Sequence, residues 1–525
     1  MSSALTELAQ LLVQQLGEDG VVRDDETLER YSQDIYSHGA PIGLLVRPAG
    51  LEQLAETVRL ATSRRVRVLP RGAGMSYTGG YLSDGAAPAL LVDLSCMNRV
   101  LDIDEENMIV RVECGCSWQE LHRALSARGL RTTYWGTLSG AGATVGGGLS
   151  NNSIFWGSGR FGSAADNVLG LQVVIGDGSV LQTGAAAQQN ASSSFMRQFG
   201  PDLTGLFLCD CGALGIKAVA ELPLMREYPH HAYASFDFPD ADALLCAMAE
   251  ISRTGLISEL FGFDPELQRQ RLRRASLAED LSMAAGVLKS SRLLQGFGSL
   301  IKLGLHGRRF AEDTTHTLHC IASEHTAEGA RHAIQQARRI VARCGGRGIA
   351  DSIPRVMRAN PFPPLNNISG ALGERWAPVH GLFPHSDAVR AYQRILELFA
   401  GHAATMQRHG ITTGCLFTAI GSRVSVLEPV FYWQDALQSL HRHTMDDSVL
   451  KVMPGFDENL EGRAAVDAIR SELSELMCEL GAVHLQIGRT YRYREAMPEA
   501  NRNLLMQLKR HLDPEDLINP GVLGR

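Results

Sequence analysis

The stretch PRGAGMSYTGG, residues 70–80, contains four glycines and directly follows the largely apolar run VRVL at residues 66–69. An ordinary turn needs only one or two glycines, because glycine adopts positive φ angles without steric cost. This loop has more glycines than a turn requires, so we infer that its backbone lies close to a ligand. Successive N–H groups in such a loop can surround an anion.

Three further glycine-rich stretches follow the first loop. They are GTLSGAGATVGGG at 136–148, the segment from RFG at 160 to the glycine at 184, and GALGI at 212–216. Together these loops indicate a large ligand that carries a pyrophosphate. The chain has no GxGxxG at the start of a helix and no GxxxxGK[ST], so the sequence disfavours a Rossmann site or a P-loop.

The 525 residues contain two regions that differ in their patterns of expected strands and helices. In the first, short strand patterns alternate with helical patterns such as 117–128, where Ser117 and Glu120 predict a capping box. In the second, longer helices accompany the strands, which predicts an α+β domain. We expect an N-terminal helical segment at 1–40, an α/β domain at 41–226, an α+β domain at 227–480 and a C-terminal segment at 481–525.

Composition and charge exclude several classes of function. The formal net charge of −7 gives no reason to expect nucleic acid as a partner. The N-terminus lacks the basic region of a secretory signal, and no run of about 18 apolar residues could span a membrane. We therefore expect a cytoplasmic protein whose ten cysteines are reduced thiols. The C-x-C pairs at 114/116 and 209/211 do not match zinc spacing, so we expect no metal.

The order of the motifs resembles the vanillyl-alcohol oxidase / p-cresol methylhydroxylase (PCMH-type) flavoprotein family. The stretches that carry the resemblance are PRGAGMSYTGG, ATVGGGLSNN, RFGSAADNVLGLQVVIGDG, GALGIKA and LDPEDLINPG. The resemblance implies an α+β fold. A PCMH-type FAD-binding domain of two α/β subdomains would be joined by the tail motif at 512–521, and an α+β cap domain would hold the substrate. It also implies that the protein is an FAD-dependent oxidase or dehydrogenase.

The same resemblance assigns residues to FAD. The first loop would wrap the pyrophosphate through Arg71, Gly72, Ala73, Gly74, Met75 and Ser76. The flavin part would be lined by Thr144, Gly146, Gly147, Asn151 and Asn152, with Ile216 bonding through its backbone and Asn519 contributing from the tail. Some members carry a histidine that attaches FAD covalently, but here Met75, Val426 and Leu427 occupy the two matching positions. We therefore expect non-covalent FAD, and Tyr432 leaves a tyrosyl linkage open.

The tail stretch GRTYRYRE, residues 488–495, resembles the Tyr-Arg pair with which phenol-oxidising members hold their substrate as a phenolate. Tyr491 and Arg492 match that pair. Tyr77 lies one position from a third tyrosine of the family, and Tyr81 is a second candidate. A phenol has a pKa of about 10, and a guanidinium with two phenolic donors stabilises its anion. The family's acidic residue near the flavin is not evident in the second glycine-rich stretch. The expected substrate is a para-substituted phenol or an aryl alcohol.

Two alternatives stay open beside the phenol. Members of this fold that oxidise 2-hydroxy acids resemble the chain in the first loop and the INPG tail. His380 in WAPVHGLFPH would then be a base or donor, and Arg423 or Arg492 would bind the carboxylate. In the other alternative, the basic amphipathic pattern at 283–310 lies on a membrane and the flavoprotein passes electrons to a quinone. We expect a small-molecule substrate, no nucleic acid, and a homodimer or higher oligomer.

Overall fold

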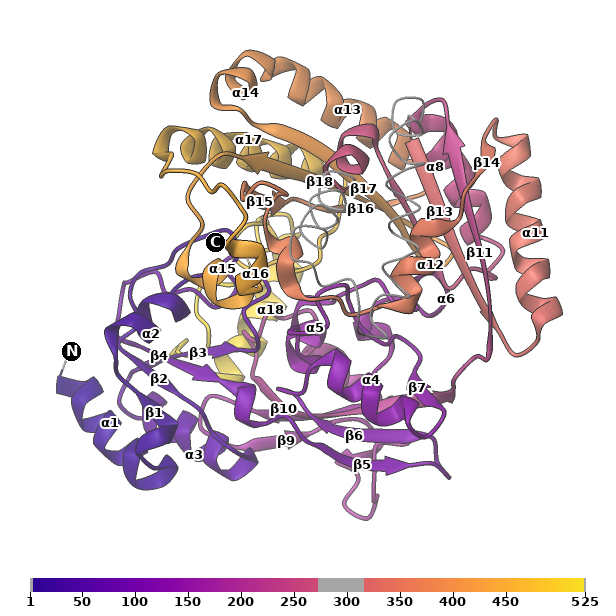
Figure 1. Cartoon of the computed structure of the whole chain (residues 1–525). Coiled ribbons are helices and arrows are strands. Elements are labelled where there is room, and N and C mark those ends of the chain that lie inside the picture. The colour runs from indigo at the N-terminus through magenta and orange to yellow at the C-terminus, as the bar shows by residue number, and fades with distance from the viewer. Residues whose placement is uncertain (1–2, 272–315, 524–525) are drawn as a thin grey trace. The chain divides into compact units, whose positions relative to one another are not determined.

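The structure, a computed structural model, describes residues 3–271 and 316–523. Its contacts divide the chain into two compact units (Figure 1). The first unit consists of Met1–Ile154, Ser163–Glu227 and His484–Arg525, and the second of Phe155–Gly162 and Tyr228–Val483. The first unit is therefore assembled from three separate stretches of chain.

The first unit begins with a four-stranded sheet in the order β1-β2-β4-β3. Its strands are β1 (Val21–Val22), β2 (Leu44–Val46), β3 (Arg67–Arg71) and β4 (Ala89–Asp93). β2, β4 and β3 run parallel, and β1 is antiparallel to β2. Strands buried on both faces need apolar residues at successive positions. Accordingly, Leu44 and Leu90 lie in one core cluster, while Leu45 and Leu91 lie in another.

Helices complete this first α/β layer. They are α1 (Ser3–Leu16), α2 (Asp25–Tyr31) and α3 (Leu51–Thr62). Leu8 and Leu12 share one face of α1 because they are four residues apart, and both are fully buried in the cluster that contains Leu54 and Val58 of α3. The expected separate segment at 1–40 is therefore part of the first unit, since its apolar face completes the core of this sheet.

A second sheet in the first unit has the order β5-β6-β10-β8-β9, with β7 also paired to β10, and all pairings are antiparallel. The strands are β5 (Val100–Asp104), β6 (Ile109–Glu113), β7 (Leu130–Thr132), β8 (Gly170–Val174), β9 (Val180–Gln182) and β10 (Ile216–Arg226), and further helices of the unit are α4 (Trp118–Ser126), α5 (Val145–Asn151), α7 (Leu203–Leu206) and α18 (Glu499–Leu512). The Oγ of Ser117 accepts a hydrogen bond from the N–H of Glu120 at 3.1 Å, which confirms Ser117 as the N-cap of α4.

The second unit is built on an eight-stranded sheet in the order β14-β11-β13-β12-β17-β18-β15, with β16 also paired to β18. Its strands are β11 (His230–Phe238), β12 (Glu259–Phe263), β13 (His316–Glu324), β14 (Arg347–Ile349), β15 (Arg375–Pro378), β16 (Gly381–Pro384), β17 (Thr412–Ile420) and β18 (Val424–Trp433). Its helices include α6 (Ser158–Phe161), α8 (Ala241–Ser252), α11 (Ala327–Arg343), α12 (Ser352–Ala359), α13 (Ala388–Gly401), α14 (Ala403–His409), α15 (Ser439–Thr444), α16 (Asp447–Leu450) and α17 (Leu460–Glu479). Helices α8, α11 and α13 pack on this sheet.

One segment differs from the expected domain division. Residues 155–162, placed by sequence within the α/β region 41–226, belong to the second unit. The reason is local pairing: the N–H of Gly159 donates to the O of Ser258 at 3.0 Å, and the N–H of Gly421 donates to the O of Ser158 at 2.9 Å. These partners lie about 100 and 260 residues away in sequence, so no local pattern signals the exchange.

Within the described residues, no helix is both long and apolar enough to cross a lipid bilayer. The basic amphipathic pattern at 283–310, on which the membrane alternative rests, lies outside the described residues.

Candidate functional site

A cavity of about 960 Å³, counted with its open mouth, lies in the first unit and is called the main cavity below. Segments from all parts of this unit line it, including the first loop, the start of α5, the loop before β10 and the C-terminal tail. The residues assigned to FAD that line it are Arg71, Gly72, Ala73, Gly74, Met75, Ser76, Thr144, Gly146, Gly147, Asn151 and Ile216. The structure therefore brings these residues from three distant stretches to one cavity.

The first loop is held by the buried guanidinium of Arg71. Its Nη1 and Nη2 donate to the O of Gly72 at 3.2 Å and the O of Ala73 at 3.1 Å. The guanidinium carbon lies 4.2 Å from the ring centroid of Tyr31, a cation–π distance. Its Nε is buried and has no hydrogen-bond partner among the described residues. An unused donor on a buried cation suits an anionic ligand.

Two kinds of glycine occur in the cavity wall. Gly146 is a packing glycine, because an added Cβ would lie 2.6 Å from the Cβ of Cys114. Gly80 is of the second kind, because a Cβ there would meet no atom within 4 Å. Gly147 is similar, with only the Oγ1 of Thr144 nearby at 3.1 Å. At these last two positions the backbone faces open space that a ligand can approach.

A second cavity, the side cavity, shares Arg71, Gly72, Ala73 and Thr144 with the main cavity. Its other lining residues include Tyr31, Asp93, Ser95, Asn98, Ser117, Gln119, Glu120 and Arg123. The carboxylate of Asp93 is fully buried and accepts hydrogen bonds from the Oη of Tyr31 at 3.0 Å and the Nε of Arg47 at 3.1 Å. Two cavities that share one wall suit an elongated ligand with a polar end.

The loop before β10 also lines the main cavity and is shaped by a buried ion pair. The Nζ of Lys217 lies 2.5 Å from the Oδ1 of Asp210, and each side chain is 2% exposed. The same carboxylate accepts from the N–H groups of Gly212 at 3.0 Å and Leu214 at 3.2 Å. Cys211 also lines the main cavity, and burial raises the pKa of its thiol to about 12. The thiol therefore stays protonated at neutral pH.

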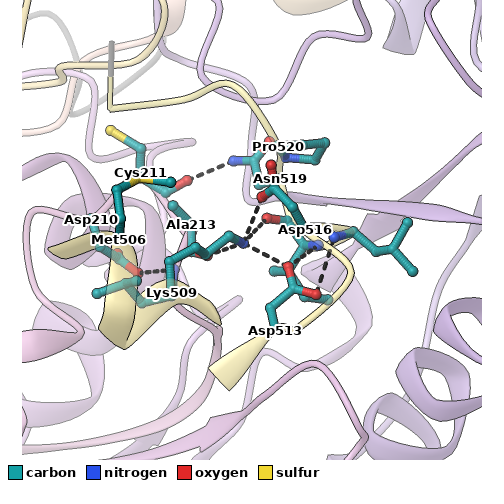
Figure 2. A network of polar contacts seen from close by, with 12 residues as sticks. Asp210, Cys211, Ala213, Met506, Lys509, Asp513, Asp516, Asn519 and Pro520 are labelled. Carbon is teal, nitrogen blue, oxygen red and sulfur yellow. Dashed lines mark hydrogen bonds and ion pairs between the residues drawn. The ribbon is translucent and has the colours of Figure 1, made fainter. Parts of the chain in front are cut away.

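Two residues assigned to FAD do not line the main cavity. Asn152 ends α5 in the left-handed region, and its Oδ1 accepts from the N–H of Ala165 at 3.1 Å. The Nδ2 of Asn519 donates to the O of Gly80 at 2.7 Å. It also donates to the O of Cys211 at 2.7 Å (Figure 2). Because both carbonyls belong to lining residues, Asn519 supports the wall from behind.

The residues predicted to hold a phenolate have unequal environments. Tyr77 is 8% exposed, and its Oη accepts from the Nε2 of Gln486 at 3.0 Å; Gln486 itself lines the main cavity. Tyr491 is 2% exposed and stacks on His484 at 3.9 Å between ring centroids. Arg492 is exposed, so its charge is more strongly screened by water than a buried guanidinium would be. Tyr77 is thus connected to the cavity through Gln486.

Tyr81, the second tyrosine candidate, does line the main cavity. Its Oη donates to the O of Gln33 at 2.5 Å, and burial raises its pKa to about 12. The hydroxyl is therefore neutral and already used as a donor within the fold.

His380 belongs to the second unit, where it is 1% exposed. The other histidine of the HGLFPH stretch, His385, hydrogen-bonds Ser425 Oγ through Nδ1 at 2.7 Å and Ser252 Oγ through Nε2 at 2.8 Å. Both ring nitrogens of His385 are thus occupied by hydroxyls. Among residues 3–271 and 316–523 there is no group of three or more His, Cys, Asp or Glu that could hold a metal ion.

Met75, which occupies the position of the attaching histidine in the family that the chain resembles, lines the main cavity. Val426 and Leu427 are fully buried in β18 of the second unit, and Tyr432 is 8% exposed. Non-covalent attachment stays a prediction.

Sequence reasoning missed several lining residues. Among them are Thr137, Ser139, Ser150, Ser153, Cys211, Lys217 and Gln486. Cys211 and Lys217 flank the fourth glycine-rich stretch, so extending that motif by one residue on each side would have found both. Gln486 stands in an irregular tail without periodicity, and only its position just before GRTYRYRE connects it to the site.

Comparisons with known proteins agree with this geometry. A family model described as an FAD binding domain matches residues 42–184. An uncharacterized FAD-linked oxidoreductase of Mycobacterium tuberculosis is 28% identical over 251 residues, which are 47% of this chain and 52% of that protein. A mitochondrial D-lactate dehydrogenase (cytochrome) of Arabidopsis thaliana is 28% identical over 242 residues, 43% of this chain and 41% of that protein. The chain therefore spans about half the length of these curated relatives.

A solved structure of p-cresol methylhydroxylase with substrate bound has a TM-score of 0.72 at 17% sequence identity, covering 99% of this chain and 97% of that chain. At this identity the likeness concerns the fold. It extends the comparison from the matched domain to both units.

The residues present fit FAD. The main cavity's lining carries the buried cation of Arg71 and, among the described residues, no carboxylate, which suits an anionic pyrophosphate. Lys217 also lines the cavity, but its charge is paired with Asp210. The unused Nε of Arg71 and the open backbone at Gly80 and Gly147 supply donors and space. Residues 42–184 are therefore an FAD-binding domain, and the chain has the α+β fold of PCMH-type flavoproteins, with FAD as its cofactor.

Proposed function

We propose that this chain is an FAD-dependent oxidoreductase that removes hydride from a C–H bond of a small organic substrate. The observation that carries the proposal is the main cavity, where the buried Arg71 and two glycine-rich loops of the matched FAD-binding domain meet the loop before β10. When bound, FAD would supply the hydride acceptor. The chain's own residues bind the cofactor's charge, fix its position and limit access of water.

The substrate class we propose first is a para-substituted phenol or an aryl alcohol. The support is the pair Tyr77 and Gln486 at the cavity and the buried Tyr491 nearby in sequence. Because the Oη of Tyr77 accepts a hydrogen bond from Gln486, its own O–H becomes a stronger donor. A donor of this kind would stabilise a substrate phenolate, whose charge favours loss of hydride from the para side chain.

A 2-hydroxy acid is the second candidate substrate. It is favoured by the D-lactate dehydrogenase relative, although that alignment covers 41% of the relative. In this alternative the exposed Arg492 or Arg423 would bind the carboxylate, and His380 would act as base or donor.

The test is anaerobic reduction of the bound flavin, followed by loss of its visible absorption. The panel contains a para-alkylphenol, its O-methyl ether, a benzylic alcohol and both enantiomers of lactate. We expect the phenol to reduce the flavin much faster than the ether, because only the phenol can form the anion. Equal rates for phenol and ether would contradict the phenolate role. Reduction by lactate alone would support the second candidate, and reduction by no member would contradict both substrate classes.

A further inference from the structure

The wall of the main cavity is tied from behind by the C-terminal segment. At the end of α18, the Nζ of Lys509 donates to the O of Ala213 at 2.7 Å and to the O of Ile518 at 2.7 Å (Figure 2). Its third hydrogen bond goes to the Oδ2 of Asp513 at 2.6 Å, and the Oδ1 of the largely exposed Asp516 is an additional ion-pair partner at 3.4 Å. An ammonium has three N–H donors, so every donor of Lys509 is used. One of the three reaches the loop that contains the lining residues Cys211 and Gly212.

The carboxylate of Asp513 gives the segment a fixed shape. Its Oδ1 accepts from the N–H of Leu517 at 3.0 Å, and its Oδ2 accepts from the N–H of Ile518 at 2.7 Å. Asp513 is 3% exposed, so these bonds are shielded from water. The turn that they close leads directly to Asn519.

Asn519 joins two loops that are far apart in sequence. Its Nδ2 donates to Gly80 O of the first loop and to Cys211 O of the loop before β10, each at 2.7 Å. The backbone N–H of Asn519 donates to Val68 O at 2.8 Å, and the N–H of Val68 donates to Leu517 O at 2.8 Å. The segment is therefore docked along β3, and the amide spans the two sides of the cavity.

We propose that Lys509 and Asn519 are positioning residues of the FAD site, which hold the loop 209–216 against the first loop and thereby set the affinity for FAD. Neither residue lines the main cavity. The proposal concerns cofactor binding alone, so it stands or falls independently of the substrate.

The physical reason is preorganisation. Without Lys509, the carbonyl of Ala213 and the buried carboxylate of Asp513 lose their cationic partner, and an unpaired buried charge is costly. The loop would then sample other positions in the apoprotein. FAD would have to order it on binding, and that ordering weakens the observed affinity.

The experiment measures the Kd of FAD for apoprotein by flavin fluorescence, together with thermal unfolding of each apoprotein. The variants are Lys509→Met, Lys509→Arg and Asn519→Ala, and the matched control is Arg510→Met, which removes an exposed cation from the same helix. We expect Lys509→Met and Asn519→Ala each to raise the Kd at least roughly tenfold. Lys509→Arg should retain part of the affinity because the charge stays, and Arg510→Met should change the Kd less than about twofold.

A double variant, Lys509→Met with Asn519→Ala, adds a second criterion. Because both residues act on one loop, the double variant should raise the Kd by less than the product of the single effects. If Lys509→Met does not fold, Asn519→Ala decides alone. Variants with a lowered unfolding temperature but an unchanged Kd would overturn the proposal, because the network would then serve folding only.

Discussion

The buried Arg71 is the only cationic side chain in the first loop, residues 70–80. We expect Arg71→Met to raise the Kd of FAD by roughly 10- to 100-fold, the loss of a charge-assisted hydrogen bond. The control is Arg67→Met on the same strand, whose partner Asp84 is half exposed; this pair should contribute little. Fluorescence titration of both apoproteins is the measurement. If both substitutions raised the Kd equally, the net positive charge of the protein, and not the buried guanidinium of Arg71, would be what attracts FAD.

Substitution of Gly74 tests whether the backbone of the same loop needs a glycine in order to bind FAD. Its φ is +74°, and an added Cβ would lie 2.8 Å from the Oη of Tyr81. Gly74→Ala should therefore lower FAD occupancy of the purified protein strongly, because the loop must shift to relieve strain and contact. Gly50→Ala is the control, since a Cβ there meets nothing within 4 Å and the φ of −177° suits any residue. Full occupancy in Gly74→Ala would contradict the close fit of this loop.

At the scale of elements, β10 and its preceding loop depend on the ion pair of Lys217 with Asp210. Lys217→Met leaves a carboxylate buried at 2% exposure, which should cost about 3–5 kcal/mol of unfolding free energy. The double variant Lys217→Met with Asp210→Asn removes that charge and should recover much of the loss. Denaturant unfolding of the apoproteins measures both. If the double variant is as unstable as the sum of the single variants, the pair is not coupled.

In the second unit, the contribution of Asp264, the residue after β12, to the stability of the folded state should depend on pH. Burial raises the pKa of Asp264 from 3.8 to about 6, although its Oδ1 accepts from the N–H of Leu267 at 2.8 Å. The folded state binds the proton more tightly than the unfolded state, so stability from this group falls as pH rises from about 4 to about 6 and stays low above. Asp264→Asn keeps the acceptor and should raise the unfolding temperature at pH 8 but not at about pH 4. An equal change at both pH values would contradict this assignment.

Some of these loops and helices could be predicted from the sequence, and others could not. The glycine-rich loops were predictable because approach of a backbone to a ligand demands glycine locally, and the cap of α4 was predictable from Ser117 and Glu120. The role of Lys509 was not, because its partner Ala213 lies 296 residues away and a lysine at the end of a helix is common in any protein. The placement of residues 155–162 in the second unit likewise depends on remote partners, Ser258 and Gly421, which no local pattern signals.

The first unit is complete only when the tail after Val483 is present. A chain that ends at Val483 lacks Gln486, Lys509 and Asn519, and with them one wall residue and two supports of the main cavity. We expect such a chain to bind no FAD while retaining the circular dichroism of the second unit's sheet. Purification of a yellow protein from this truncation would contradict the role given to the tail.

The division of the first unit into three stretches has a consequence for synthesis in the cell. The ribosome completes the second unit's sequence before it has made residues 484–525, which belong to the first unit. A nascent chain can therefore bury the second unit's core early, while the glycine-rich loops lack the support of residues 484–525 until these are synthesised. The FAD-binding cavity can therefore be completed only after residues 484–525 have been made, later than the sequence of the second unit.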